Sequence, residues 1–203
     1  MAGLAGSTDS RVSQMVAPTD EELIGAFQRG DASAFDALVG RYKDQLTNFA
    51  FRFLGDFDEA DDVVQETFIR VYRKGETYRP VARFSTWIYT IASNLAKTHL
   101  RRMKRGSLFS LSRGREGGDE RDYEIPDDGN SADRQAERSL EAAIIQKALD
   151  SIPAKYREVV VLSNIQDLTY EEICEITNLN IGTVKSRLNR GRGMLKRLLH
   201  SLR

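Results

Sequence analysis

Apolar residues recur every three or four positions through almost every ordered-looking stretch of this sequence, and no other feature restricts the fold as much. After Asp31, for example, Phe35, Leu38, Tyr42 and Leu46 share one side of a helical wheel. A half-buried strand would instead alternate apolar and polar residues, which is not the pattern of these stretches. The sequence therefore predicts an all-α protein.

Capping residues predict where these helices begin. Thr19 and Glu22 form a capping box at the start of a first helix, and Asp31 caps a second one. We expect a third helix over residues 57–74 and, after a loop that breaks the periodicity, a fourth from about residue 86 to residue 105. The first half of the chain is thus expected to be a small helical bundle.

A change in composition divides the chain into two parts. Residues 106–136 are rich in Gly, Ser, Asp and Arg, and such a segment cannot bury enough apolar surface to offset the entropy of ordering it. We therefore expect two small helical domains, over residues 19–105 and 137–203, joined by a flexible acidic linker. Residues 1–18 are expected to form a disordered tail.

The charges cancel over the whole chain, with 30 Lys and Arg against 30 Asp and Glu, but they are strongly segregated. Residues 56–66 carry six acids and no base, and residues 97–115 carry seven bases and no acid. Seven Lys and Arg follow Glu175, and no acid does. Since a mixed solvated surface would scatter its signs, these blocks predict separate faces for separate partners.

The sequence gives little support to an enzyme. Cys174 is the only cysteine, which excludes an intramolecular disulfide and a multi-cysteine zinc site; we interpret it as a packing thiol, with a redox sensor as the alternative. His99 and His200 lie far apart in sequence, and no phosphate-binding glycine loop occurs, so we expect no catalytic residues, metal or cofactor. The lack of a long apolar run or a signal peptide predicts a soluble, cytoplasmic protein.

The most specific motif lies near the C-terminus, in "LTYEEICEITNLNIGTVKSRLNRGRGMLKR". Thr169 and Glu172 form a second capping box, residues 178–181 make a tight turn, and Asn180 caps the next helix. Ser, Asn, Lys and Arg lie opposite the apolar stripe of this last helix, as in a recognition helix that enters the DNA major groove. A solvated amphipathic helix is the alternative.

Two glycines do not suit the interior of this helix. Gly191 and Gly193 each cost on the order of 1 kcal/mol relative to alanine. Either the helix frays there, or its backbone closely approaches a partner.

The C-terminal motif resembles both the output domain of LuxR-type regulators and region 4 of bacterial sigma factors. The first half separates them, because "DDVVQETFIRVYRK" and "RFSTWIYTIASNLAKTHLRRMKR" resemble regions 2.2 and 2.3 to 2.4 of an extracytoplasmic-function (ECF, group 4) sigma factor of the sigma-70 family. This resemblance implies an RNA polymerase sigma factor that directs promoter-specific transcription initiation. A stand-alone helix-turn-helix regulator of the LuxR type is the alternative.

The resemblance implies that the third helix binds core RNA polymerase, docking on the coiled coil of the β′ subunit, with the β subunit as a further partner. An acidic patch that contains the apolar Ile69 suits a protein better than DNA, whose phosphates it would repel. A solvated helix face is the alternative. The expected contact residues are Asp61, Asp62, Gln65, Glu66, Ile69 and Arg73.

The resemblance further implies that the fourth helix and the loop before it recognise and open the −10 element. Aromatic and polar groups can hold an unstacked base while cations follow the backbone. The expected residues are Tyr78, Arg79, Arg83, Phe84, Trp87, Asn94, Lys97, Arg101 and Arg102. Trp87 and Tyr89 are favoured as core or pocket wall over direct DNA ligands, and Asn94 has a purely structural alternative.

In the second domain the resemblance implies that the last helix recognises the −35 element, with Arg192 contacting a phosphate. The expected residues are Thr183, Lys185, Ser186, Asn189, Arg190 and Arg192. The implied partners are promoter DNA and an anti-sigma factor, which could hold the protein at the inner membrane face; no small-molecule substrate is expected. The acidity of the linker predicts that it threads a basic channel of the polymerase.

Overall fold

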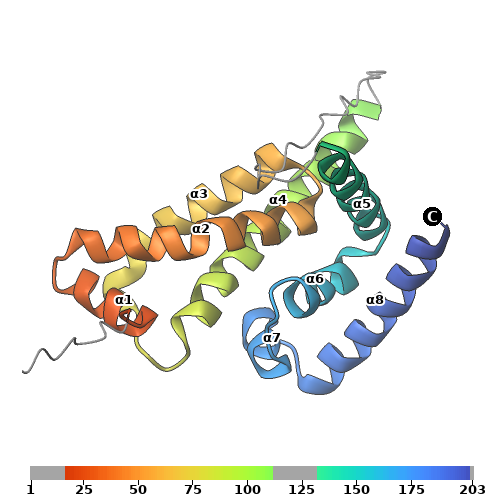
Figure 1. Ribbon diagram of the computed structural model, residues 1–203. Helices are drawn as coiled ribbons and strands as arrows, with labels where there is room; N and C mark the ends of the chain where they lie inside the picture. The colour runs from red at the N-terminus through yellow and green to blue at the C-terminus, as the bar shows by residue number, and fades with distance from the viewer. Residues whose placement is uncertain (1–16, 112–131, 202–203) are drawn as a thin grey trace, which may run out of the picture.

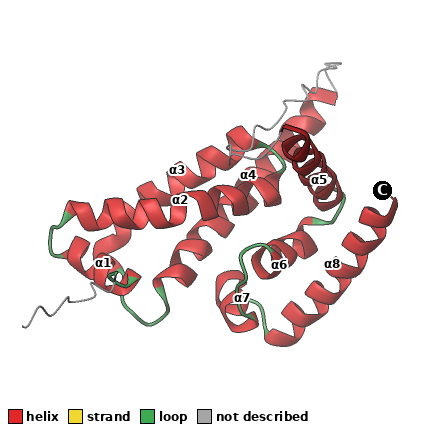
Figure 2. Ribbon diagram, in the orientation of Figure 1, coloured by secondary structure: helices red, strands yellow, loops and turns green. Residues whose placement is uncertain are grey.

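The computed structural model describes residues 17–111 and 132–201. Helices are the regular elements of both stretches, and neither stretch contains a strand (Figure 1, Figure 2). The helices are α1 (Asp20–Gln28), α2 (Ala32–Leu54), α3 (Phe57–Lys74), α4 (Phe84–Leu111), α5 (Ala132–Asp150), α6 (Ala154–Asn164), α7 (Tyr170–Thr177) and α8 (Ile181–Ser201), with a 3-10 turn, η1 (Gly75–Thr77), after α3. The predicted all-α fold is confirmed. In the described part of the chain, no helix combines the length and the apolar character needed to cross a bilayer.

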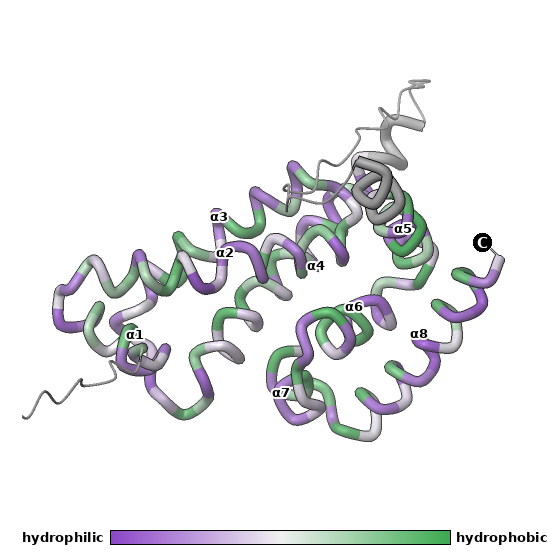
Figure 3. The backbone as a smooth tube through the Cα atoms, viewed as in Figure 1, coloured by the Kyte–Doolittle hydropathy of each residue, from purple (hydrophilic) through white to green (hydrophobic). Residues whose placement is uncertain are grey.

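Helices α1 to α4 form a first bundle, in which α2 packs against α1, α3 and α4. Apolar and polar segments alternate along α2 and α3, as expected of helices with one buried side (Figure 3). The side chains buried in this bundle include Leu38, Leu46, Phe49, Ala60, Val63, Val71, Ile88, Tyr89 and Ala92. Within each helix these residues lie on one side, which is the pattern from which the helices were predicted.

Helices α5 to α8 form a second bundle, in which α8 packs against α5, α6 and α7. Its buried side chains include Leu149, Ile152, Val159, Val161, Leu162, Ile173, Ile176, Val184 and Leu188. Val184 and Leu188 belong to the predicted apolar stripe of α8, whereas Leu195 and Leu198 are only partly buried.

The two bundles pack against each other, because α2 contacts α5 and α6 while α4 contacts α7. Their buried apolar residues form one continuous cluster. Polar side chains join them as well: the Tyr89 hydroxyl donates to Gln166 Oε1 at 2.6 Å. Gln146 in α5 donates to the carbonyl oxygen of Phe51 in α2 at 3.4 Å.

The predicted capping signals are present in the structure. Thr19 forms a complete capping box with Glu22 at the start of α1, and Thr169 forms one with Glu172 at the start of α7. Asp31 caps α2 by accepting a hydrogen bond from the backbone N–H of Ser33. Each of these helices therefore begins where the local sequence satisfies its free N–H groups.

Helix α4 differs from its predicted bounds at both ends. It begins at Phe84 because the backbone N–H of Phe84 donates to Glu21 Oε1, at 3.1 Å, and this distant cap is not visible in the local sequence. It continues to Leu111, and residues 106–111 contain no proline that would end it. Helix α5 likewise starts before the predicted end of the linker, and the rest of the predicted linker, like the predicted tail up to residue 16, lies outside the described residues.

Candidate functional site

The outward face of α3 carries acidic and amide side chains around an apolar one. Asp62, Gln65 and Ile69 are exposed, and Ile69 keeps 43% of its surface accessible. Gln65 donates to Asp61 at 2.6 Å, and Glu66 accepts from Arg70 at 2.8 Å. These bonds run along the helix surface and leave Ile69 uncovered.

A groove of about 400 Å³ separates this face from α4. Asp62, Gln65, Glu66 and Ile69 line it from α3, so the structure brings four of the six predicted polymerase contacts to one depression. The predicted contact Arg73 is exposed further along α3. The α4 side of the groove is lined by Leu95, Thr98, His99 and Arg102.

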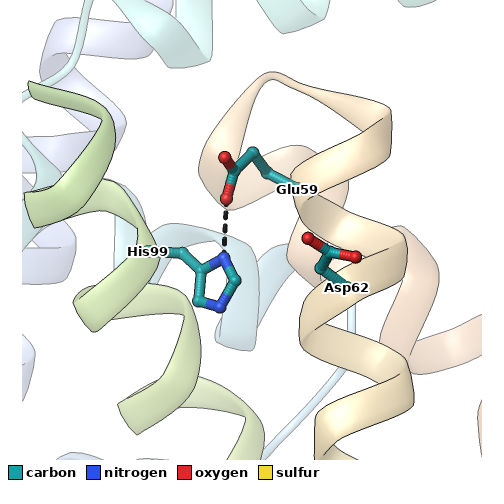
Figure 4. A group of neighbouring side chains, drawn as sticks. All are labelled: Glu59, Asp62 and His99. Atoms are coloured by element: carbon teal, nitrogen blue, oxygen red, sulfur yellow. Dashed lines mark hydrogen bonds and ion pairs between the residues drawn. The ribbon is translucent and has the colours of Figure 1, made fainter. Parts of the chain in front are cut away.

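At one end of the groove, Glu59, Asp62 and His99 lie together (Figure 4). Their possible ligand atoms fall within 4.8 Å of one another, a spacing that a metal ion could use. However, one oxygen of Glu59 already accepts from His99 Nδ1 at 2.6 Å and from Arg102 Nη2 at 2.9 Å. Because the guanidinium supplies the positive charge here, the cluster acts as an ion-pair network that ties α3 to α4.

This network controls the titration of Glu59. Burial works to raise the pKa of its carboxyl group, but hydrogen bonds from His99 and Arg102, together with the charge of Arg102, outweigh burial and hold the pKa below its ordinary value. Glu59 is therefore a carboxylate at neutral pH.

The predicted aromatic contacts of the −10 element form a cluster beneath the loop. Tyr78 is buried and donates from its hydroxyl to the carbonyl oxygen of Ala82 at 2.9 Å. Phe84 is completely buried, with its ring centroid 5.9 Å from that of Tyr78, and the half-buried Trp87 lies 5.1 Å from Tyr78. In this arrangement the rings support the loop, and Phe84 offers no surface to a ligand.

Two predicted −10 cations contact acids of the second bundle. Lys97 Nζ lies 3.1 Å from Glu158 Oε1, and Arg83 lies 3.3 Å from Glu172. The buried Glu158 carboxylate also accepts from Ser93 Oγ at 2.5 Å. The other predicted polar contacts, Arg79, Asn94, Arg101 and Arg102, have exposed side chains.

Helix α8 presents its predicted contacts to solvent on one side. Lys185, Ser186, Asn189 and Arg190 are exposed, and Thr183 is half-buried. The exposed Arg192 donates to Asn164 Oδ1 at 3.0 Å and to Ser163 Oγ at 3.3 Å, which ties it to the end of α6. The helix begins as predicted, because Asn180 Oδ1 accepts from the backbone N–H of Thr183 at 2.8 Å.

The two glycines of α8 lie in different surroundings. A Cβ at Gly191 would come within 2.6 Å of Val160 Cγ2 and 3.3 Å of the Tyr156 carbonyl oxygen, so this glycine lets α8 approach α6 closely. A Cβ at Gly193 would meet nothing within 4 Å. The sequence suggested that the helix frays at these glycines or that its backbone closely approaches a partner. For Gly191 that partner is α6 of the same chain.

Several residues at these surfaces were not anticipated from the sequence. Lys155 and Tyr156, at the start of α6, border the exposed face of α8 and line a pocket with it. The sequence feature that could have indicated them is a cation followed by an aromatic residue in the first turn of the helix after Pro153. Arg157 and Glu158 are buried at the contact between the bundles, and no local signal marks them.

Cys174 is half-buried in α7. Burial, with Glu171 and Glu175 nearby, raises the pKa of its thiol. A thiol that is protonated at neutral pH is a poor nucleophile, which favours a packing role over a redox sensor.

Comparisons with known proteins agree in both halves of the chain. Residues 38–106 match Sigma-70 region 2, and residues 142–195 match Sigma-70, region 4. The ECF RNA polymerase sigma factor SigW of Bacillus subtilis is 38% identical over 183 residues, which cover 90% of this chain and 97% of SigW. The ECF RNA polymerase sigma factor SigE of Mycolicibacterium smegmatis is 36% identical and is matched over 74% of its length by 97% of this chain.

Two solved structures share the arrangement of helices. One is CnrH in complex with the cytosolic domain of CnrY, with a TM-score of 0.67 and 25% identity over 90% of this chain and 97% of CnrH. The other is the sigma factor RpoE of Bartonella quintana in complex with the anti-sigma factor NepR, with a TM-score of 0.64 and 26% identity over 82% of this chain and 96% of RpoE.

Proposed function

Because this chain belongs to the ECF RNA polymerase sigma factors of the sigma-70 family, which direct polymerase to promoters, we propose that it divides this task among three separate surfaces. Helices α1 to α4 act as region 2 and helices α5 to α8 as region 4. The match to region 2 favours the sigma factor over the LuxR-type regulator, which the C-terminal motif alone left open. In this role the chain binds macromolecules and catalyses no reaction of its own.

The α3 face is the surface for core polymerase. The exposed Ile69 can be buried by a partner, at about 25 cal/mol per Å² of apolar area, while the acids around it disfavour DNA. The groove beside it gives a partner helix a depression to enter. Asp61, Asp62, Gln65, Glu66 and Arg73 complete this surface.

The loop before α4 and the exposed side of α4 are the surface for the −10 element. Arg79, Asn94 and Arg101 are accessible for contacts to an opened strand. Lys97 and Arg83 already pair with Glu158 and Glu172, so DNA phosphates compete with these carboxylates for the two cations. Binding at the −10 element is therefore coupled to the contact between the bundles.

The exposed side of α8 is the surface for the −35 element. Arg190 can donate two hydrogen bonds to guanine, Asn189 can pair with adenine, and the neighbouring cations can contact phosphates. In this arrangement Lys185, Ser186, Asn189 and Arg190 are exposed to solvent. The −35 surface thus requires no rearrangement to reach duplex DNA.

An anti-sigma factor is the proposed regulatory partner. It would compete for the α3 face and for the DNA-binding surfaces. The structurally similar RpoE is in complex with the anti-sigma factor NepR, which supports this assignment by similarity.

One observation supports the proposal most strongly. The same chain exposes an acidic α3 face around the apolar Ile69 and, separately, a cationic face on α8. The test is a pull-down of core polymerase, followed by transcription from a library of random promoters. We expect association with the core enzyme and transcription from a defined subset of sequences. Tight sequence-specific DNA binding by the isolated protein, with no association to polymerase, would contradict the proposal.

A further inference from the structure

A pocket of about 330 Å³ lies between the first turn of α6 and the exposed side of α8. Lys155 and Tyr156 line it from α6, and Ser186, Arg187 and Arg190 line it from α8. It opens on the same side of α8 that we assign to the −35 element. The two α6 residues that line it, Lys155 and Tyr156, are not among the contacts predicted from the recognition-helix motif.

Gly191 explains why α6 reaches this position. Its missing side chain lets the α8 backbone pack directly on Val160 and Tyr156, which places the start of α6 beside Arg190. Because the contact involves backbone atoms as well as side chains, the position of Lys155 and Tyr156 relative to α8 is fixed by packing. The pocket is therefore a built feature of the fold.

The pocket concentrates positive charge. Three of its lining residues, Lys155, Arg187 and Arg190, are cations, and no Asp or Glu is among the described residues that line it. The Lys155 ammonium lies 5.0 Å from the centroid of the Tyr156 ring, which is a cation–π distance. Three cations around a polar opening suit a small anion with several acceptor oxygens.

Tyr156 also lies beside Arg190, the predicted base reader, and both residues line the pocket. The interaction of the phenol with the Arg190 guanidinium, together with the charge of Lys155, lowers the pKa of Tyr156. A planar guanidinium held on one side in this way loses fewer conformations when it binds DNA.

We propose that this pocket binds a backbone phosphate of the DNA at the −35 element, with Lys155 contacting the phosphate and Tyr156 positioning Arg190. The inference rests on the proposed function of α8 and extends the −35 surface from one helix to two. It gives region 4 a phosphate contact that lies outside the recognition helix and fixes the register of α8 in the groove.

The test uses the full chain with core polymerase and a duplex enriched from a randomised library by the wild-type holoenzyme. Lys155→Ala is compared with Lys196→Ala, which removes an exposed lysine of α8 that lines a different groove, with α5. The measurements are the salt dependence of duplex binding and the interference caused by ethylating single phosphates. For Lys155→Ala we expect the slope of log K against log salt to fall by about 0.9 and one phosphate to lose its interference.

The role of Tyr156 is tested with Tyr156→Phe, which keeps the ring and its packing and removes only the hydroxyl. We expect it to weaken binding in the wild-type background and to have no further effect in the Arg190→Ala background, as a positioning residue requires. Equal losses in both backgrounds would overturn this role.

The outcomes separate this inference from the proposed function. If Arg190→Ala weakens binding but Lys155→Ala behaves like Lys196→Ala, with every phosphate interference retained, Lys155 is a solvated cation and the inference is wrong. If Arg190→Ala itself binds like the wild type, the assignment of α8 to the −35 element fails with it.

Discussion

Arg157 in α6 donates a hydrogen bond of 2.8 Å to the carbonyl oxygen of Phe53 in the last turn of α2. The same guanidinium contacts the Asp150 side chain at 3.0 Å and the Asp150 carbonyl oxygen at 2.7 Å. A buried cation of region 4 thus satisfies a free carbonyl group at the C-terminal end of a region 2 helix, where positive charge is favoured. The two bundles are joined by specific polar bonds as well as by apolar packing.

Arg157→Ala should lower the free energy of unfolding by about 2 kcal/mol, because it leaves Phe53 O without its buried donor and removes the cation paired with Asp150. Urea unfolding of the full chain measures this. Arg70→Ala is the matched control, since it removes only an exposed i,i+4 ion pair with Glu66 and should cost about 0.5 kcal/mol or less. Equal, small losses for both variants would mean that the contact between the bundles adds nothing to stability.

The glycines of α8 provide a paired test of packing. Gly191→Ala should destabilise the protein by about 1–3 kcal/mol, since the new Cβ would overlap Val160 and press on the Tyr156 backbone. Gly193→Ala should instead stabilise it by up to about 1 kcal/mol, because the site is open and alanine favours the helix. Thermal unfolding of the two variants should shift in opposite directions, and shifts of the same sign would contradict the α6–α8 packing.

The Glu59 network predicts a dependence of stability on pH. Because the folded-state pKa of Glu59 lies below its ordinary value, the unfolded state binds more protons, so this stabilisation is present above the unfolded pKa and is lost as the pH falls through the folded pKa. Glu59→Gln should therefore cost about 1 kcal/mol near neutral pH and nothing in strong acid. Urea unfolding at a series of pH values checks this, and a cost that stays constant in acid would count against the network.

Glu158→Gln should favour binding of single-stranded −10 DNA. The substitution keeps a hydrogen-bond acceptor for Ser93 but removes the negative charge that holds Lys97. With Lys97 released, we expect the affinity of the holoenzyme for a single-stranded −10 oligonucleotide to rise by about threefold, the equivalent of roughly 0.6 kcal/mol. Unchanged affinity in fluorescence anisotropy would show that the ion pair does not compete with DNA.

Local signals predicted the helices well. The capping boxes at Thr19 and Thr169, the cap at Asn180 and the apolar stripe of α2 depend on residues within a few positions of each other, so the sequence shows them directly. Helix α4 shows the limit of this reasoning. Its first turn is capped by Glu21 from another helix, and neither sequence spacing nor composition indicates that contact.

The exposed faces of α3 and α8 were predictable, because each belongs to a single helix. Surfaces were not predictable where two elements combine. Arg157 and Glu158 look like ordinary polar residues of α6 until Phe53 and Ser93 are placed beside them. Tyr156 in the same way gains its place at the α8 surface only through Gly191.

The central claim is that α3 binds polymerase while α8 binds the −35 element. Its most direct test compares Glu66→Lys with Arg190→Ala in two assays, binding to core polymerase and transcription that depends on the −35 element. Glu66→Lys reverses a charge on the α3 face, and Arg190→Ala removes a cation from the exposed side of α8. We expect Glu66→Lys to weaken polymerase binding by at least about tenfold, the equivalent of about 1.4 kcal/mol, while Arg190→Ala retains polymerase binding and loses −35-dependent transcription. The same defect from both substitutions in both assays would contradict the separation of the two surfaces.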